Sequence, residues 1–146
     1  MSTQSSLYPR LLLVVALAAA WIMSVNASSA ASIQDSIARY ATEARSEDSS
    51  FDAFSAERGH VLFSSRPATG KPDTPSCTSC HSDNPAGGGQ TRAGKEIAPM
   101  ALAKTPGRYS DVKKLKKWFR RNCKSVLGRV CTSLEKGDFL TFMATQ

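Results

Sequence analysis

The chain has 146 residues, a length that allows one domain and excludes a multidomain architecture. Its formal net charge is +7, and the positive charge is concentrated: residues 108–129 hold nine Lys or Arg and a single acid, Asp111. Such a run is typical of a solvated helix face, and it can also attract an acidic partner.

The first 31 residues have the pattern of a secretory signal peptide. Arg10 precedes an apolar run from Leu11 to Val25, and small residues follow as far as Ala31. The run is shorter than the roughly 20 residues that a membrane span needs. We therefore expect cleavage, export to the periplasm and no stable membrane insertion, with a mature domain over 32–146. An uncleaved membrane anchor is the alternative.

Two short helices are predicted next, over residues 32–44 and 54–63, with a polar linker at 46–50 between them. Ser55 has the side chain of an N-cap for the second helix. Gly59 inside that helix costs about 1 kcal/mol relative to Ala, which is tolerable where another helix crosses at close range.

The loop over 66–76 leads into Cys77-Thr78-Ser79-Cys80-His81, the C-x-x-C-H pattern of covalent haem attachment. Each thiol can form a thioether with a haem vinyl group, and the adjacent imidazole can bind the iron. Cys77 and Cys80 are therefore the predicted anchors of one haem c, and His81 its proximal ligand. A zinc half-site lacks a convincing fourth ligand, and a dithiol redox motif lacks its βαβ setting.

Residues 82–99 are predicted to be irregular, and such a loop can wrap the edge of a haem. Arg92 and Lys95 on this loop either pair with the haem propionates or face water. Met100 follows His81 on the same stretch and is one candidate for the sixth iron ligand. Packing of its side chain in the core is the other reading, because Met fills gaps well.

Residues 111–123 are predicted to form an amphipathic helix with a basic face opposite an apolar one. The apolar stripe collects Val112, Leu115, Trp118, Phe119 and Asn122. Asn122 is a polar residue on a stripe expected to be buried, where an amide needs partners. It therefore competes with Met100 for the iron, although an inward helical Asn is more often a cap or a satisfied core amide.

The last predicted helix begins at the capping box Thr132–Glu135 and runs to about Ala144. We expect its apolar face to cross the helix that carries Gly59, with Met143 packed in the core. No strands are predicted. The fold class is therefore all-α, a small class I cytochrome c-type fold around one covalently bound haem.

Cys123 and Cys131 remain once the haem has taken two cysteines, and export permits a disulfide. If they form a disulfide, it closes a short loop beside Asn122 and stabilises the folded state by about 2–3 kcal/mol.

Three stretches resemble the SHP-type cytochromes c, the sphaeroides haem protein group: residues 71–81, 91–99 and 118–131. The resemblance spans most of the chain from Ser32 on. It implies a class I cytochrome c fold, with Asn122 as the sixth ligand of ferric iron and a disulfide between Cys123 and Cys131. In that family the amide leaves on reduction, and the ferrous iron then binds oxygen and other small diatomic ligands. A dihaem cytochrome c and a membrane cytochrome b are its usual redox associates.

The leading functional hypothesis is a periplasmic monohaem cytochrome whose Asn122 gives way to oxygen or a related diatomic ligand on reduction. The rival is a plain electron carrier with His81 and Met100 as axial ligands. A third is an enzyme that turns over oxygen, peroxide or nitric oxide, for which Arg92 or Arg121 would be the nearest candidate distal groups. Nucleic acid is excluded as a partner of an exported haem protein.

Overall fold

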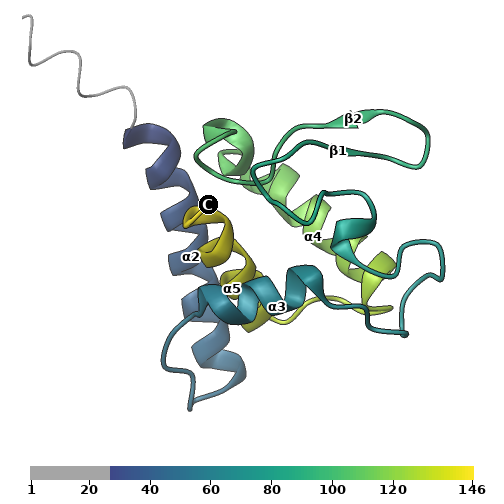
Figure 1. Ribbon diagram of the computed structural model, residues 1–146. Helices are drawn as coiled ribbons and strands as arrows, with labels where there is room; N and C mark the ends of the chain where they lie inside the picture. The colour runs from purple at the N-terminus through teal and green to yellow at the C-terminus, as the bar shows by residue number, and fades with distance from the viewer. Residues whose placement is uncertain (1–26) are drawn as a thin grey trace, which may run out of the picture.

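The computed structural model describes residues 27–146, which form a helical fold (Figure 1). Its α-helices are α2 (Ala27–Glu47), α3 (Ala56–Ser64), α4 (Val112–Val126) and α5 (Ser133–Ala144). Residues 1–26, which hold most of the predicted signal peptide, lie outside the described residues. The predicted all-α class is confirmed.

Helix α2 is longer than predicted. Its buried positions recur at helical spacing: Ile33, Ser36, Tyr40 and Ala44. The prediction of a linker from residue 46 is wrong, because the helix continues to Glu47. The Glu47 carboxylate accepts hydrogen bonds from the Ser133 hydroxyl at 2.6 Å and its backbone N–H at 3.1 Å, at the start of α5. This long-range contact holds the last turn of α2 in place.

Helices α3 and α5 cross with their backbones in contact, which confirms the close crossing expected at Gly59. A Cβ on Gly59 would overlap with the Asp138 carbonyl of α5, so only glycine fits there. Ser55 caps α3 by accepting from the Arg58 N–H at 3.2 Å. The capping box of α5 is also present, with the Thr132 hydroxyl and the Glu135 carboxylate each accepting from the other's backbone N–H.

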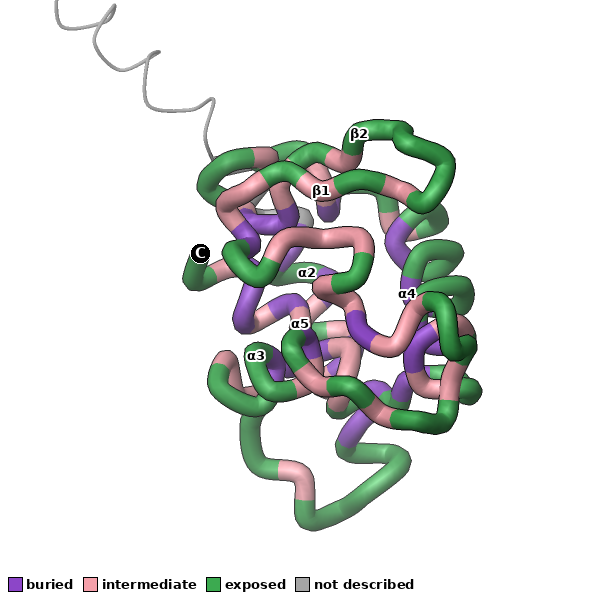
Figure 2. Tube along the Cα trace, turned by 45° about the vertical axis from the view of Figure 1, so that its right-hand side comes forward, coloured by how far each residue is buried: buried purple, intermediate pink, exposed green. Residues whose placement is uncertain are grey.

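The core between the helices is largely aromatic. Phe119 of α4 packs edge-to-face on Tyr40 of α2, with ring centroids 5.8 Å apart, and on Phe139 of α5 at 5.6 Å. Met143 is fully buried in the same core. Figure 2 shows buried residues on the facing sides of the helices, and exposed ones on the loops and along much of α4.

A short antiparallel ribbon, β1 (Gly89–Gln90) with β2 (Glu96–Ile97), interrupts the loop that was predicted to be irregular. Thr91 N–H donates to the Lys95 carbonyl at 2.8 Å, and Gly94 adopts φ +77° in the turn between the strands. Such a two-residue ladder carries no periodicity, which is why the sequence did not indicate it. None of the described helices has the length and hydropathy of a membrane span.

Candidate haem site

The haem-attachment motif forms a tight 3-10 turn, η2 (Cys77–Ser79), that its own sequence stabilises. Ser76 is buried and caps the turn, accepting from the Thr78 N–H at 3.2 Å. In return the Ser79 hydroxyl accepts from the Ser76 N–H at 3.2 Å, which completes a capping box. The His81 N–H then donates to the Cys77 carbonyl at 3.0 Å. The backbone thus presents both cysteines and the histidine from one turn.

Cys77 and Cys80 are each half-buried on this turn, and neither takes part in a disulfide. Burial raises the pKa of Cys77 to about 11, with its own backbone and the neighbouring Cys80 as smaller influences. Before a haem is attached, the Cys77 thiol is therefore neutral at pH 7, unlike the low-pKa thiolates of dithiol redox motifs. Within residues 27–146, no group of three or more His, Cys, Asp or Glu side chains is arranged to hold a metal ion.

His81 is a neutral imidazole at physiological pH. Burial, together with a smaller effect of the nearby positive charge of Arg108, lowers its pKa to about 4. Its Nδ1 atom is buried and has no hydrogen-bond partner. A neutral imidazole is the form that binds iron, because protonation would occupy the donor lone pair. Two thiols and a neutral imidazole on one turn therefore fit a covalently attached haem.

The ribbon packs directly on the motif. The Gln90 N–H donates to the Cys80 carbonyl at 2.8 Å, and a Cβ on Gly89 would overlap with the same carbonyl oxygen. A hollow of about 660 Å³ lies there, lined by residues 78–82 and 88–92. Arg92 pairs with Asp73 on the opposite loop, so its charge is already partnered. Lys95 is exposed.

Helix α4 carries Asn122 on a different face from the one expected. The residues facing the core are Leu115, Phe119, Cys123 and Val126. Trp118 is 48% exposed and Asn122 is exposed, so the prediction of one buried stripe is wrong for these two. The reason is geometric: at 100° per residue, Trp118 and Asn122 form a row about 60° from the row of Leu115 and Phe119. The aromatic core covers only the second row.

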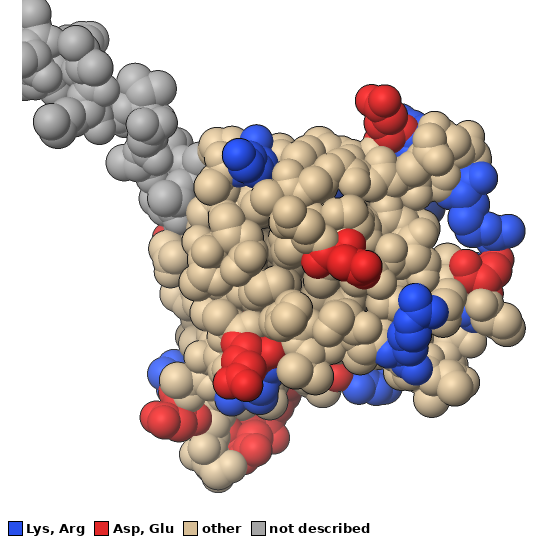
Figure 3. Space-filling model, in the orientation of Figure 1, with Lys and Arg blue, Asp and Glu red and all other residues tan. Residues whose placement is uncertain are grey.

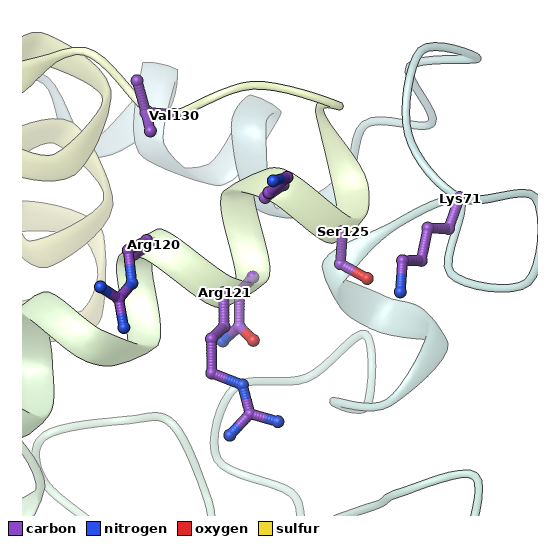
Figure 4. A pocket seen from close by; sticks show the side chains of 7 residues that line it. Lys71, Arg120, Arg121, Ser125 and Val130 are labelled. Carbon is purple, nitrogen blue, oxygen red and sulfur yellow. The ribbon is translucent and has the colours of Figure 1, made fainter.

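Asn122 lines a second hollow of about 600 Å³ along the last turns of α4. Figure 4 shows this hollow from close by, with Arg120, Arg121 and Ser125 on α4. The hollow's other lining residues are mostly basic: Lys71, Arg120, Arg121, Lys124, Ser125 and Val130. No carboxylate lines it. The side chains of Lys71 and Ser125 come from different segments and lie beside each other in Figure 4. The site therefore combines an uncharged amide donor with an electropositive surround.

Met100, the rival ligand, is packed in the core. It is 8% exposed and belongs to the buried hydrophobic cluster. Its N–H donates to the Pro85 carbonyl at 2.8 Å, and its carbonyl accepts from the Tyr109 hydroxyl at 2.6 Å. Both backbone groups are thus held, which favours the packing reading of this side chain.

A disulfide joins Cys123 to Cys131, with Cα atoms 5.6 Å apart. It connects the residue next to Asn122 to the segment before α5. Arg129 within this short loop forms a two-point pair with Glu135, at 2.7 and 2.8 Å.

Three long-range contacts had no signal in the sequence. Asp138 is buried and accepts from both Arg58 and the Ser55 backbone, which fixes the α3–α5 crossing. Glu47 binds the first turn of α5. Residues 69–74 bind the end of α4. Each joins residues more than 50 positions apart, which spacing along the chain does not reveal.

The chain matches one family over residues 49–143, described as a domain of unknown function, DUF1924. It is 55% identical over 91 residues to the cytochrome c-type protein SHP of Cereibacter sphaeroides, covering 62% of this chain and 70% of that protein. It is 31% identical over 109 residues to cytochrome c'' of Methylophilus methylotrophus, covering 74% and 76%.

Two solved structures share the fold. Oxidised SHP, described as an oxygen-binding cytochrome c, superposes with a TM-score of 0.72 at 47% identity, covering 78% of this chain and 96% of that one. Oxidised cytochrome c'' from Methylophilus methylotrophus superposes with a TM-score of 0.68 at 28% identity, covering 80% and 96%.

Proposed function

The chain belongs to the SHP family of c-type cytochromes and binds one covalent haem c, and we propose that it is a periplasmic cytochrome in which Asn122 holds the ferric iron and gives way to a small diatomic ligand on reduction. The observation that carries the proposal is the contrast between the two candidate ligands. Asn122 is exposed at a hollow, whereas Met100 is packed in the core with both backbone groups bonded.

The motif turn holds the cofactor in this proposal. Cys77 and Cys80 form the thioethers, and the neutral imidazole of His81 binds the iron. The haem supplies an iron that carries one electron and, when ferrous with an available sixth position, binds diatomic gases. The ribbon packed on Cys80 keeps the turn rigid, so the histidine side of the site is built to stay in place.

Asn122 is the part of the site that can leave. An amide is a hard, weak donor that suits ferric iron better than ferrous iron, whereas a thioether stabilises the ferrous form. Reduction therefore weakens an asparagine ligand, and a gas ligand competes for its place. SHP, 55% identical to this chain, is an oxygen-binding cytochrome c, which supports oxygen or a related diatomic molecule here.

Electrons reach the site from an acidic redox partner in this proposal, with a dihaem cytochrome c and a membrane cytochrome b as the candidates. The Lys and Arg side chains of α4 are all exposed, and none forms an ion pair within residues 27–146: Lys113, Lys114, Lys116, Lys117, Arg120, Arg121 and Lys124. On the face that Figure 3 displays, acidic and basic side chains are mixed, with several acids at the lower left and several basic groups toward the right-hand edge. An uncompensated basic helix beside Asn122 attracts an acidic surface to the site.

The experiment that tests the proposal is the visible spectrum of the purified holoprotein, first ferric, then ferrous under argon, then ferrous with oxygen. We expect a five-coordinate, high-spin ferrous form that changes reversibly when oxygen is added. A closed, low-spin ferrous form that ignores oxygen would contradict the proposal and favour the His81/Met100 electron carrier. Oxygen consumption with an electron donor, measured in the same samples, separates reversible binding from turnover.

A further inference from the structure

The loop before the haem motif is fastened to the helix that carries Asn122. The Lys71 N–H donates to the Ser125 carbonyl at 2.7 Å, and the Thr69 hydroxyl donates to the Leu127 carbonyl at 3.0 Å. The hydroxyls of Thr74 and Ser125 share a further hydrogen bond at 2.8 Å. A helix leaves its last four carbonyls without intrahelical partners, and the 69–74 segment binds one of these, that of Ser125, together with the carbonyl of the C-cap residue Leu127.

Two glycines bring these backbones into direct contact. A Cβ on Gly70 would overlap with the carbonyl oxygens of Ser125 and Val126. A Cβ on Gly128 would overlap with the Thr69 carbonyl, and Gly128 also adopts φ +71°. By contrast, a Cβ on Gly107 or on Gly94 would meet no atom within 4 Å. Residues 69 and 70 therefore lie against the end of α4 and the Gly128 turn with no side chain between the backbones.

This contact joins the two halves of the proposed haem site. Thr74 precedes the anchor Cys77 by three residues, and Ser125 follows Asn122 by three, one helical turn away. Both connections are stiff, because Ser76 is buried and caps the motif turn, while Asn122 and Val126 belong to the same α-helical ladder. A shift of the 69–74 segment relative to α4 therefore changes the position of Asn122 relative to the attached haem.

We propose that the 69–74 segment is a positioning element that sets how closely Asn122 approaches the iron, and hence how readily the amide leaves. The inference rests on the proposed function, because it needs Asn122 as the ligand. Gly70, Thr74 and Ser125 act through Asn122 as positioning residues. Loosening the contact weakens the ferric amide bond.

The test uses the ferric holoprotein and imidazole as the added ligand, mixed in a stopped-flow instrument. Imidazole must displace the amide, so its binding rate reports how often Asn122 leaves. Gly70→Ala is expected to bind imidazole about tenfold faster than the natural protein, equivalent to about 1.4 kcal/mol. Gly107→Ala is the matched control, since its new methyl group meets open space.

A milder pair of variants guards against misfolding of Gly70→Ala. Thr74→Val removes the hydroxyl bonded to Ser125 and keeps the side-chain shape. Thr42→Val is its control, because the Thr42 hydroxyl bonds only within α2, to Ala38. We expect a rate increase of about threefold for Thr74→Val, from loss of one hydrogen bond, and none for Thr42→Val.

Asn122→Ala separates the inference from its premise. Fast imidazole binding in Asn122→Ala, with Gly70→Ala adding nothing to it, is the expected pattern. If Asn122→Ala is fast while Gly70→Ala and Thr74→Val match their controls, the positioning role is overturned and the ligand assignment stands. If Gly70→Ala still accelerates binding in the Asn122→Ala background, the segment acts on something other than Asn122. If Asn122→Ala is no faster than the natural protein, the ligand assignment itself fails.

Discussion

Helices α3 and α5 touch backbone to backbone, whereas α4 packs on α2 and α5 at the distance of aromatic side chains. At the first contact, Gly59 leaves no room for a Cβ, and the buried Asp138 binds Arg58. At the second, Phe119 stands between α4 and its neighbours. The difference distinguishes a rigid frame, formed by α3 and α5, from α4, the helix that carries the proposed leaving ligand Asn122. The position of α4 depends on a few side chains, a disulfide and the 69–74 segment.

The largest effect is expected from removing the aromatic spacer. Phe119→Ala should lower the free energy of unfolding by about 3–5 kcal/mol, as for other large-to-small core changes, and should also speed imidazole binding to the ferric protein. Phe54→Ala removes a ring from the frame, where it packs on Gly137. Chemical denaturation and stopped-flow mixing of both variants test the comparison. The distinction between the frame and α4 is wrong if Phe54→Ala speeds imidazole binding to the ferric protein as much as Phe119→Ala does.

Removing the disulfide should cost less. Cys123→Ala with Cys131→Ala opens a short loop, and loop-closure entropy predicts a loss of about 2–3 kcal/mol. Because Cys123 is next to Asn122, we also expect a larger high-spin fraction in the ferric electron paramagnetic resonance spectrum. Unchanged spin state with reduced stability would show that the bridge supports the fold and leaves Asn122 unaffected.

A change at the α3–α5 crossing should affect stability alone. Gly59→Ala places a methyl group against the Asp138 carbonyl, and overpacking outweighs the gain in helix propensity, so we expect a loss of about 1–2 kcal/mol. The ferric spectrum should not change, since the frame carries neither proposed ligand. Denaturant titration followed by both circular dichroism and haem absorbance checks this, with Gly107→Ala as the control.

The smallest effect concerns the pair that ties the end of α4 to α5. Arg129 lowers the pKa of Glu135, so this pair stabilises the fold fully above the carboxyl's unfolded pKa and loses that effect as pH falls through the folded one. Glu135→Gln should therefore cost below about 1 kcal/mol at pH 7, since Arg129 is largely exposed. The difference between variant and natural protein should shrink toward zero in acid. If the difference in free energy of unfolding stayed constant across the pH range, the ion pair between Arg129 and Glu135 would not be its cause.

Local patterns in the sequence predicted the parts of the molecule that are locally determined. The haem-attachment turn, the caps Ser55 and Thr132, and the glycine crossing at Gly59 each depend on a few neighbouring residues or on one steric requirement. The exposure of Asn122 depends instead on which row of α4 the aromatic core covers. The helical pattern fixed the two rows but not the choice between them.

Contacts between distant segments account for the rest. Glu47 extends α2 because Ser133 lies beside it, and the 69–74 segment meets α4 across about fifty residues of chain. Side chains that find a partner only in the folded state leave no periodicity to detect. The proposed ligand was therefore identified from a family resemblance, and its surroundings became visible only in the structure.

The most direct test of the central claim is the ferric absorption spectrum of Asn122→Ala beside that of Met100→Leu. We expect Asn122→Ala to convert the ferric protein to an open, high-spin form, and Met100→Leu to leave the spectrum as it is. The opposite result, an unchanged Asn122→Ala and an opened Met100→Leu, would contradict the account and identify Met100 as the sixth ligand.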